Sequence, residues 1–166
     1  MKAPGEIRVR SGVPKDLPTI ARHYAHADSP WDPFGDASKL SRIPIDCLLL
    51  VGVQGTYAGF LYWFEGRKPY FDRSVDRYAN LRELHVLERF RGKGLSKALI
   101  ERFLADARTR GLVHAFVDTD EDNVIAQHPY ESFGFRPYRK VFHYRLRLDA
   151  PRNGPFRNDG LGFHEG

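Results

Sequence analysis

Two glycines between a strand-like and a helix-like segment form the clearest candidate for a chemical site in this chain. Arg91-Gly92-Lys93-Gly94 follows the segment 82–87 and precedes a stretch with helical periodicity. Glycines let a backbone pass close to a ligand, and the unpaired amides of a first helical turn attract anions. The turn lacks the Gly-Lys-Ser or Gly-Lys-Thr of a P-loop and the third glycine of a dinucleotide-binding turn. We therefore expect an anion site that is not an ATP or NAD site of those kinds.

A longer pattern around this turn and a second pattern downstream resemble the GNAT superfamily of N-acetyltransferases. The cofactor motif of that family is Arg or Gln, two residues, Gly, one residue, then Gly or Ala, and it stands here as Arg89-Phe90-Arg91-Gly92-Lys93-Gly94. The second signature, Asn-x-x-Ala-x-x-x-Tyr followed by Gly-Phe, is matched by Asn123, Ala126, Tyr130 and Gly134-Phe135. Two independent matches make the resemblance specific, and it extends from Ile7 to about Leu148.

The resemblance implies that acetyl-CoA is the co-substrate. The pyrophosphate would be held by the turn and the start of the helix, and the backbone of the preceding strand would pair with the pantetheine arm like an added strand. Asn123 and Tyr130 would contact the same arm. The implied binding residues are Leu84, His85, Val86, Arg91, Gly92, Lys93, Gly94, Leu95, Ser96, Asn123 and Tyr130.

Acetylation of an amine needs a base for the amine proton and an acid for the departing thiolate. Tyr130 matches the general acid of the family. Glu83 is the first choice for the base, because family members often carry an acidic residue at this position, and His85 is the second choice, since it shares a strand face with Glu83. Asp118 and Asp120 are further candidates. Pro129, just before Tyr130, threatens to kink the helix that aims the phenol.

Residues of the two long loops are candidates for the acceptor pocket. Trp31, Phe34, Tyr70 and Phe71 would supply an apolar rim for an amine, or belong to the core. Two acidic residues, Asp72 and Asp76, would attract a cationic acceptor, or lie on a solvated loop. Cys47 is interpreted as a small buried hydrophobe, and the histidines show no paired ligand spacing, so no metal is predicted.

The elements that must position these residues alternate between strand-like and helix-like patterns. Residues 66–80 show no clear period and form a candidate functional loop. Strands are expected at residues 7–10, 48–53, 57–64, 82–87, 112–119 and 138–148, and helices at residues 14–25, 95–110 and 123–133.

The expected fold is of the α/β (α+β) class and GNAT-like, with helices flanking a central, mostly antiparallel mixed sheet. Residues 1–148 would form one domain, and residues 149–166, rich in Gly, Pro and Asn, an extended or mobile tail. Residues 141–148 are a candidate homodimer edge, because family members commonly pair through this strand.

Composition and charge narrow the class of function further. The 166 residues suffice for one domain, and the net charge of +5 suits an anionic ligand. The lone cysteine and the lack of an apolar leader or span predict a cytoplasmic protein without a membrane partner. Basic residues are scattered among acidic ones, which argues against nucleic acid. The function predicted is an N-acetyltransferase acting on an unidentified small-molecule or peptide amine, and the alternative is a non-catalytic acyl-CoA sensor or partner subunit.

Overall fold

The computed structural model of the chain describes residues 5–24 and 43–139. Residues 1–134 form one compact unit and residues 135–166 a second. All the helices and strands given below belong to the first unit. The predictions for Trp31, Phe34, residues 140–148 of the final strand and the tail at 149–166 lie outside the described residues. The predicted domain boundary at residue 148 therefore stays a prediction.

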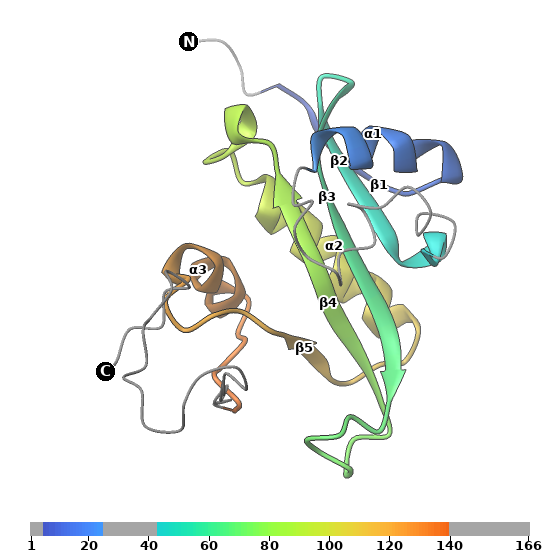
Figure 1. Cartoon of the computed structure of the whole chain (residues 1–166), viewed down its shortest axis with the longest axis vertical. Coiled ribbons are helices and arrows are strands. Elements are labelled where there is room, and N and C mark those ends of the chain that lie inside the picture. The colour runs from blue at the N-terminus through green and yellow to red at the C-terminus, as the bar shows by residue number, and fades with distance from the viewer. Residues whose placement is uncertain (1–4, 25–42, 140–166) are drawn as a thin grey trace, which may run out of the picture. The chain divides into compact units, whose positions relative to one another are not determined.

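Five strands form one sheet in the order β1-β2-β3-β4-β5 (Figure 1). Neighbours pair antiparallel except β4 and β5, which are parallel. The mixed, mostly antiparallel sheet that the sequence predicts is confirmed. The bounds are β1 (Ile7–Ser11), β2 (Leu48–Val53), β3 (Thr56–Arg67), β4 (Arg77–Val86) and β5 (Ala115–Val117).

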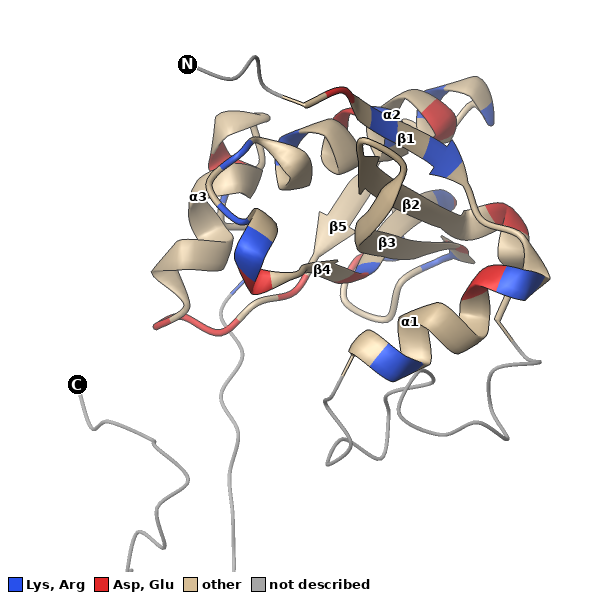
Figure 2. Ribbon diagram, turned by 90° about the horizontal axis from the view of Figure 1, so that it is seen from above, with Lys and Arg blue, Asp and Glu red and all other residues tan. Residues whose placement is uncertain are grey.

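Two helices cover opposite faces of this sheet (Figure 2). On one face, α1 (Leu17–His23) packs in a cluster with β2 and β3 that includes Ile20, Leu50 and Phe60. On the other face, α2 (Leu95–Thr109) packs against β1 to β4, and Phe103 meets the ring of Trp63 edge-on at 5.4 Å. Both cores follow from the apolar stripes that predicted the helices, since each stripe buries one side of its helix.

The remaining helices of the described chain are short. Three single turns of 3-10 helix, η1 (Pro14–Asp16), η3 (Ile45–Cys47) and η4 (Glu88–Phe90), lead into α1, β2 and the glycine turn. α3 (Val124–Ser132) follows β5 and continues through Pro129. Within the described residues, no helix has the length and apolar content needed to cross a bilayer.

The expected loop at residues 66–80 is corrected by the structure, because six of its fifteen residues belong to a long hairpin. β3 and β4 remain paired as far as Arg67 and Arg77, which leaves residues 68–76 as the connection. An ion pair of 2.7 Å between Glu65 and Arg77 joins the two strands near this end. At this end Gly66 pairs with Tyr78 and Arg67 with Arg77. These residues lack the alternation of apolar and polar side chains that marks a half-buried strand, so the pattern did not reveal them as strands. β5 has three residues and is therefore shorter than the strand predicted at residues 112–119.

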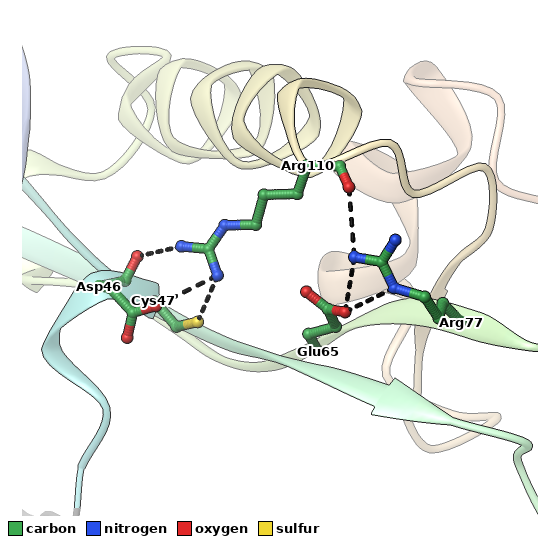
Figure 3. Close-up of polar contacts among 5 residues, drawn as sticks. All are labelled: Asp46, Cys47, Glu65, Arg77 and Arg110. Carbon is green, nitrogen blue, oxygen red and sulfur yellow. Dashed lines mark hydrogen bonds and ion pairs between the residues drawn. The ribbon is translucent and has the colours of Figure 1, made fainter.

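Arg110, just after α2, fastens that helix to the sheet and to η3 (Figure 3). Its guanidinium donates to the backbone oxygen of Asp46 at 2.8 Å and lies 3.6 Å from the sulfur of Cys47. It also lies 4.6 Å from the centre of the Trp63 ring. Arg77 donates in turn to the backbone oxygen of Arg110 at 3.2 Å. The carboxyl end of α2 is therefore held at several points.

Candidate functional site

The glycine turn has the backbone that an anion site requires. Gly92 and Gly94 have φ values of 73° and 79°, in the left-handed region that side chains avoid. Gly94 is the N-cap of α2 and offers no side chain, and the first bond into the helix runs from the amide of Ala98 to the oxygen of Gly94. The amides of Leu95, Ser96 and Lys97 therefore have no acceptor within the helix. They form one end of the candidate site.

The second part of the site is the outer edge of β4. Leu87 donates to the oxygen of Ala58 in β3 at 2.9 Å, and alternate residues of an antiparallel strand point their peptide groups the same way. The peptide N–H and C=O groups of His85 therefore face β3, whereas those of Leu84 and Val86 face outward. Among the described residues, β5 pairs with β4 only at Ala79 to Leu81, and the two strands diverge beyond that point (Figure 1). Within the described residues, no strand pairs with the edge at Leu84 and Val86, whose one side-chain hydrogen bond here is the bond from Arg91 to the oxygen of Val86.

A β-bulge in β4 separates the paired half of the strand from the open half. Tyr62 of β3 pairs with Glu83 and Trp63 with Leu81, so Arg82 is an extra residue with no partner in β3. Bulges bend a strand and re-aim its side chains. This one puts Leu81 on the sheet face covered by α2 and Glu83 on the face covered by α1. In a regular strand, both would lie on one face.

The face of β4 covered by α1 carries both base candidates. Glu83 and His85 pair with Tyr62 and Phe60, which belong to the core under α1. His85 meets the ring of Tyr24 edge-on at 5.2 Å, so its imidazole is held between a helix and the sheet. Glu83 and His85 are both partly buried. The expected common face of these two residues is confirmed, because the bulge precedes both.

Tyr130 lies on α3 and is only 8% exposed. Its burial, together with the negative charge of Glu83, raises the pKa of Tyr130 to about 12. Glu83 and Tyr130 are far apart in the sequence, but they lie close enough in the fold for the charge of one to affect the pKa of the other. The phenol stays protonated at neutral pH, as a proton donor must. Pro129 does not interrupt α3 and does not turn Tyr130 toward solvent.

The remaining candidates from α3 and β5 lie on the surface. Asn123 is the N-cap of α3, and its side-chain oxygen accepts from the amide of Ala126 at 3.2 Å. Its side-chain amide can still donate to a ligand. Asp118 and Asp120 follow β5 with exposed side chains, and the backbone oxygen of Asp120 accepts from Gln127. Both aspartates are exposed, whereas Glu83 is partly buried.

The described part of the expected acceptor rim lies in the loop between β3 and β4. Tyr70 is 76% exposed and meets Phe71 edge-on at 5.1 Å. Phe71 meets Phe116 of β5 at the same distance, which ties this loop to the sheet. Asp72 accepts from the amide and hydroxyl of Ser74, so it shapes the loop.

Two further predictions concern Cys47, interpreted as a small buried hydrophobe, and the expectation of no metal site. Cys47 is buried, and this burial raises the pKa of its thiol, as expected of a small hydrophobe. In the described ranges, no group of three metal-ligating side chains lies together.

Sequence reasoning missed two features of the site, and both are tertiary. The bulge at Arg82 has no residue signature in the chain. The guanidinium of Arg91 donates from Nε to the backbone oxygen of Val86 at 3.2 Å, whereas the motif assigned only the backbone of Arg91. The basic residues at the turn are visible in the sequence. In the structure, the charged groups of Arg89 and Lys93 lie 5.0 and 5.4 Å from the centre of the Phe90 ring.

Comparison with known proteins places this geometry in context. The sequence model described as "Acetyltransferase (GNAT) family" matches residues 16–135. A curated relative, N-alpha-acetyltransferase 30 of Schizosaccharomyces pombe, is 30% identical over 63 residues. That alignment covers 38% of this chain and 42% of the relative, so the chain spans less than half the length of this relative.

Solved structures share the fold at low sequence identity. The aminoglycoside N-acetyltransferase AAC(6')-Iy in complex with CoA has a TM-score of 0.71 and 20% identity, over 89% of this chain and 99% of that one. Ard1 from Thermoplasma volcanium has a TM-score of 0.64 and 22% identity, over 80% of this chain and 84% of its own. Likeness at these identities establishes the fold.

Proposed function

This chain belongs to the GNAT family of acetyltransferases, and on that premise we propose that it transfers an acetyl group from acetyl-CoA to a primary amine. The observation that carries the proposal is the juxtaposition of two ligand-binding backbones. The turn at Gly92 and Gly94 exposes the helix amides that suit pyrophosphate, and the edge of β4 exposes the peptide groups that suit an amide-containing arm.

The proposed CoA site uses backbone groups that the strand and the turn already expose. Leu84 and Val86 would each offer one amide and one carbonyl to the pantetheine arm, which contains two amides of its own. The uncapped amides of Leu95 and Ser96 would bind the pyrophosphate, helped by the basic side chains of Arg89 and Lys93. The proposed set also includes His85, Arg91, Gly92, Gly94, Asn123 and Tyr130.

The proposed chemistry uses Glu83 as the base and Tyr130 as the acid. Acetyl-CoA supplies an acetyl group activated as a thioester. Glu83 would take the proton of the attacking amine, directly or through a water molecule, and His85 on the same face is the alternative acceptor. Tyr130 would donate its phenolic proton to the sulfur, which its raised pKa keeps available.

The acceptor is proposed as a class, since two kinds of amine are named among the similar proteins. The curated relative is named an N-alpha-acetyltransferase, and a structural neighbour of the same fold is named an aminoglycoside acetyltransferase. A peptide N-terminus and an aminosugar are therefore the two acceptors to test first. None of these names favours the alternative of a non-catalytic sensor.

Cofactor binding is tested with glycine variants at the two ends of α2. Gly94→Ala and Gly111→Ala both place a side chain at positive φ, 79° and 73°, and a Cβ at either position meets no atom within 4 Å. Both should lose about 1 kcal/mol of stability through backbone strain. Only Gly94→Ala should weaken the binding of CoA in calorimetry, because its new methyl group lies at the turn. Equal affinity in both variants would contradict the assignment of the turn.

Turnover is tested by release of free thiol from acetyl-CoA with a panel of peptides and aminosugars. The proposed function predicts acceptor-dependent release with at least one of the two classes. A chain that binds CoA tightly but releases no thiol with any amine would instead be a sensor or a partner subunit.

A further inference from the structure

Among the hydrogen bonds that hold the connection between β4 and the glycine turn, one is donated by the side chain of Arg91. The segment between Leu87 and Gly94 is largely exposed, with Glu88, Arg89 and the turn itself in solvent. Two backbone bonds close η4, from Phe90 to Leu87 at 2.8 Å and from Arg91 to Glu88 at 3.1 Å. The bond from Nε of Arg91 to the oxygen of Val86, at 3.2 Å, returns from the turn to the strand.

This side-chain bond joins the two parts of the proposed CoA site. Val86 is the last residue of β4, and its peptide groups face outward, toward the edge proposed for pantetheine. Arg91 immediately precedes Gly92, where the turn proposed for pyrophosphate begins. A carbonyl oxygen has two lone pairs, so the oxygen of Val86 can accept from Arg91 and from a ligand amide together.

From this geometry we infer that Arg91 is a positioning residue whose side chain fixes the distance between the pyrophosphate turn and the pantetheine edge. The inference rests on the proposed function and goes beyond the backbone contacts of the motif. A ligand that spans two subsites binds tightly only when their separation is already correct, because the second contact then costs little additional ordering. Each half of CoA alone gains nothing from a fixed separation.

The test therefore compares CoA with its nucleotide half, 3′-phospho-ADP, which keeps the pyrophosphate but lacks pantetheine. Arg91→Met removes the donor. Lys93→Met is the control, since it removes an equal charge from a neighbouring side chain that lies over the Phe90 ring and, among the described residues, donates no hydrogen bond to β4. Both variants should weaken 3′-phospho-ADP to a similar extent. Only Arg91→Met should lower the ratio of CoA affinity to 3′-phospho-ADP affinity, by about tenfold, the effect of one hydrogen bond to a charged group.

An unchanged ratio in Arg91→Met would overturn the inference, and it would mean that Arg91 acts only as a charge near the phosphates. If the unsubstituted chain binds neither CoA nor 3′-phospho-ADP, the proposed function itself falls and the inference falls with it. These two failures are therefore distinguishable.

A second measurement needs no variant and covers a failure of Arg91→Met to fold. Proton exchange of the Nε–H of Arg91, followed by NMR, should be slow in the free protein and remain slow when CoA binds. Rapid exchange in the free protein would show that the bond from Arg91 to Val86 does not persist. Loss of protection on binding CoA would show that the side chain leaves Val86 to make room for the ligand, and either result would contradict the inference.

Discussion

At the scale of single residues, the proposed chemistry depends on two groups whose environments differ. Tyr130 is enclosed, and the charge of Glu83 adds to burial in raising its pKa. Glu83 is held in β4 just beyond the bulge, on the face that α1 covers. A buried neutral phenol near a partly exposed carboxylate is an arrangement in which one group keeps its proton while the other can accept one. The proposed acid and base roles rest on this difference.

Replacing Tyr130 with Phe tests the acid role directly. The ring and its packing remain, so the melting temperature and the affinity for CoA should change little. The turnover number kcat should fall by about a hundredfold, with KM nearly unchanged, because general acid catalysis acts on the chemical step. Steady-state kinetics with the acceptor found in the thiol assay measures this, and full kcat in the variant would assign the proton to water or to another donor.

The raised pKa of Tyr130 also predicts how stability depends on alkaline pH. The native pKa is about 12, whereas an exposed Tyr in the unfolded chain titrates near about 10. The native state therefore holds this proton more tightly, and the stability it contributes is complete below about pH 10 and is lost as the pH rises toward the native value. The free energy of unfolding should fall more steeply above about pH 10 in the unsubstituted protein than in Tyr130→Phe. Parallel curves in urea titrations would refute the shift.

At the scale of elements, the site depends on how a few side chains attach helices to the sheet. Asp16 in η1 joins β1 to the start of α1: its two oxygens accept from Arg10 at 2.7 Å each, and one also accepts from the amide of Val13 at 2.8 Å. Arg110 makes the corresponding attachment at the carboxyl end of α2 (Figure 3). Both helices border the site, α1 through Tyr24 and α2 through the glycine turn.

Asp16→Asn should cost about 1–3 kcal/mol of stability at neutral pH, since it leaves a bidentate pair incomplete. The side chain of Asp16 is 10% exposed, and the bond from Arg10 is the main cause that lowers the pKa of its carboxyl. Stability from this group is therefore present above the unfolded pKa and lost as the pH falls through the lower native pKa. The difference from the unsubstituted protein should vanish in acid. Glu101→Gln, on the exposed side of α2, is the control and should be near neutral.

Arg110→Lys should lower the free energy of unfolding by about 1 kcal/mol, although the charge is kept. A lysine cannot hold the fork of bonds to Asp46 while stacking on Trp63. Arg108→Lys, two residues earlier and exposed, should leave stability unchanged. Equal melting temperatures for the two variants would show that the contacts of Arg110 contribute nothing net.

At the scale of the whole molecule, the proposed site combines segments from the middle and the end of the first unit. β4, the glycine turn and α2 are continuous in the chain, whereas α3 brings Asn123 and Tyr130 from beyond β5. A ligand that contacts both groups should couple them. Binding of CoA is therefore a test of the assembled site as well as of its parts.

Saturating CoA should raise the melting temperature, because a ligand that binds only the native state stabilises it by mass action. At a hundred times Kd the gain is about 2.7 kcal/mol, which corresponds to several degrees for a chain of this size. Thermal unfolding with and without CoA measures it, and Gly94→Ala should show a smaller shift than Gly111→Ala. A melting curve that CoA leaves unchanged would contradict the proposed co-substrate.

Local patterns were enough to determine most elements and to locate the turn proposed as the anion site. The apolar stripes of α1 and α2 are contiguous in sequence, and Gly92 and Gly94 are required by the backbone of the turn itself. The two motifs also indicated the family, and the resemblance to the family was enough to predict the fold. Such features depend on neighbours in the chain, so the sequence displays them directly.

Only the tertiary structure decided how the site residues lie relative to one another. The bulge at Arg82 depends on the register between β3 and β4, and the outward direction of Leu84 and Val86 depends on which residues pair with β3. The proximity of Glu83 to Tyr130 and the bond from Arg91 to Val86 depend on the tertiary arrangement of the segments that carry them. Strand register and side-chain direction are set by contacts between distant segments, and no local residue pattern encodes them.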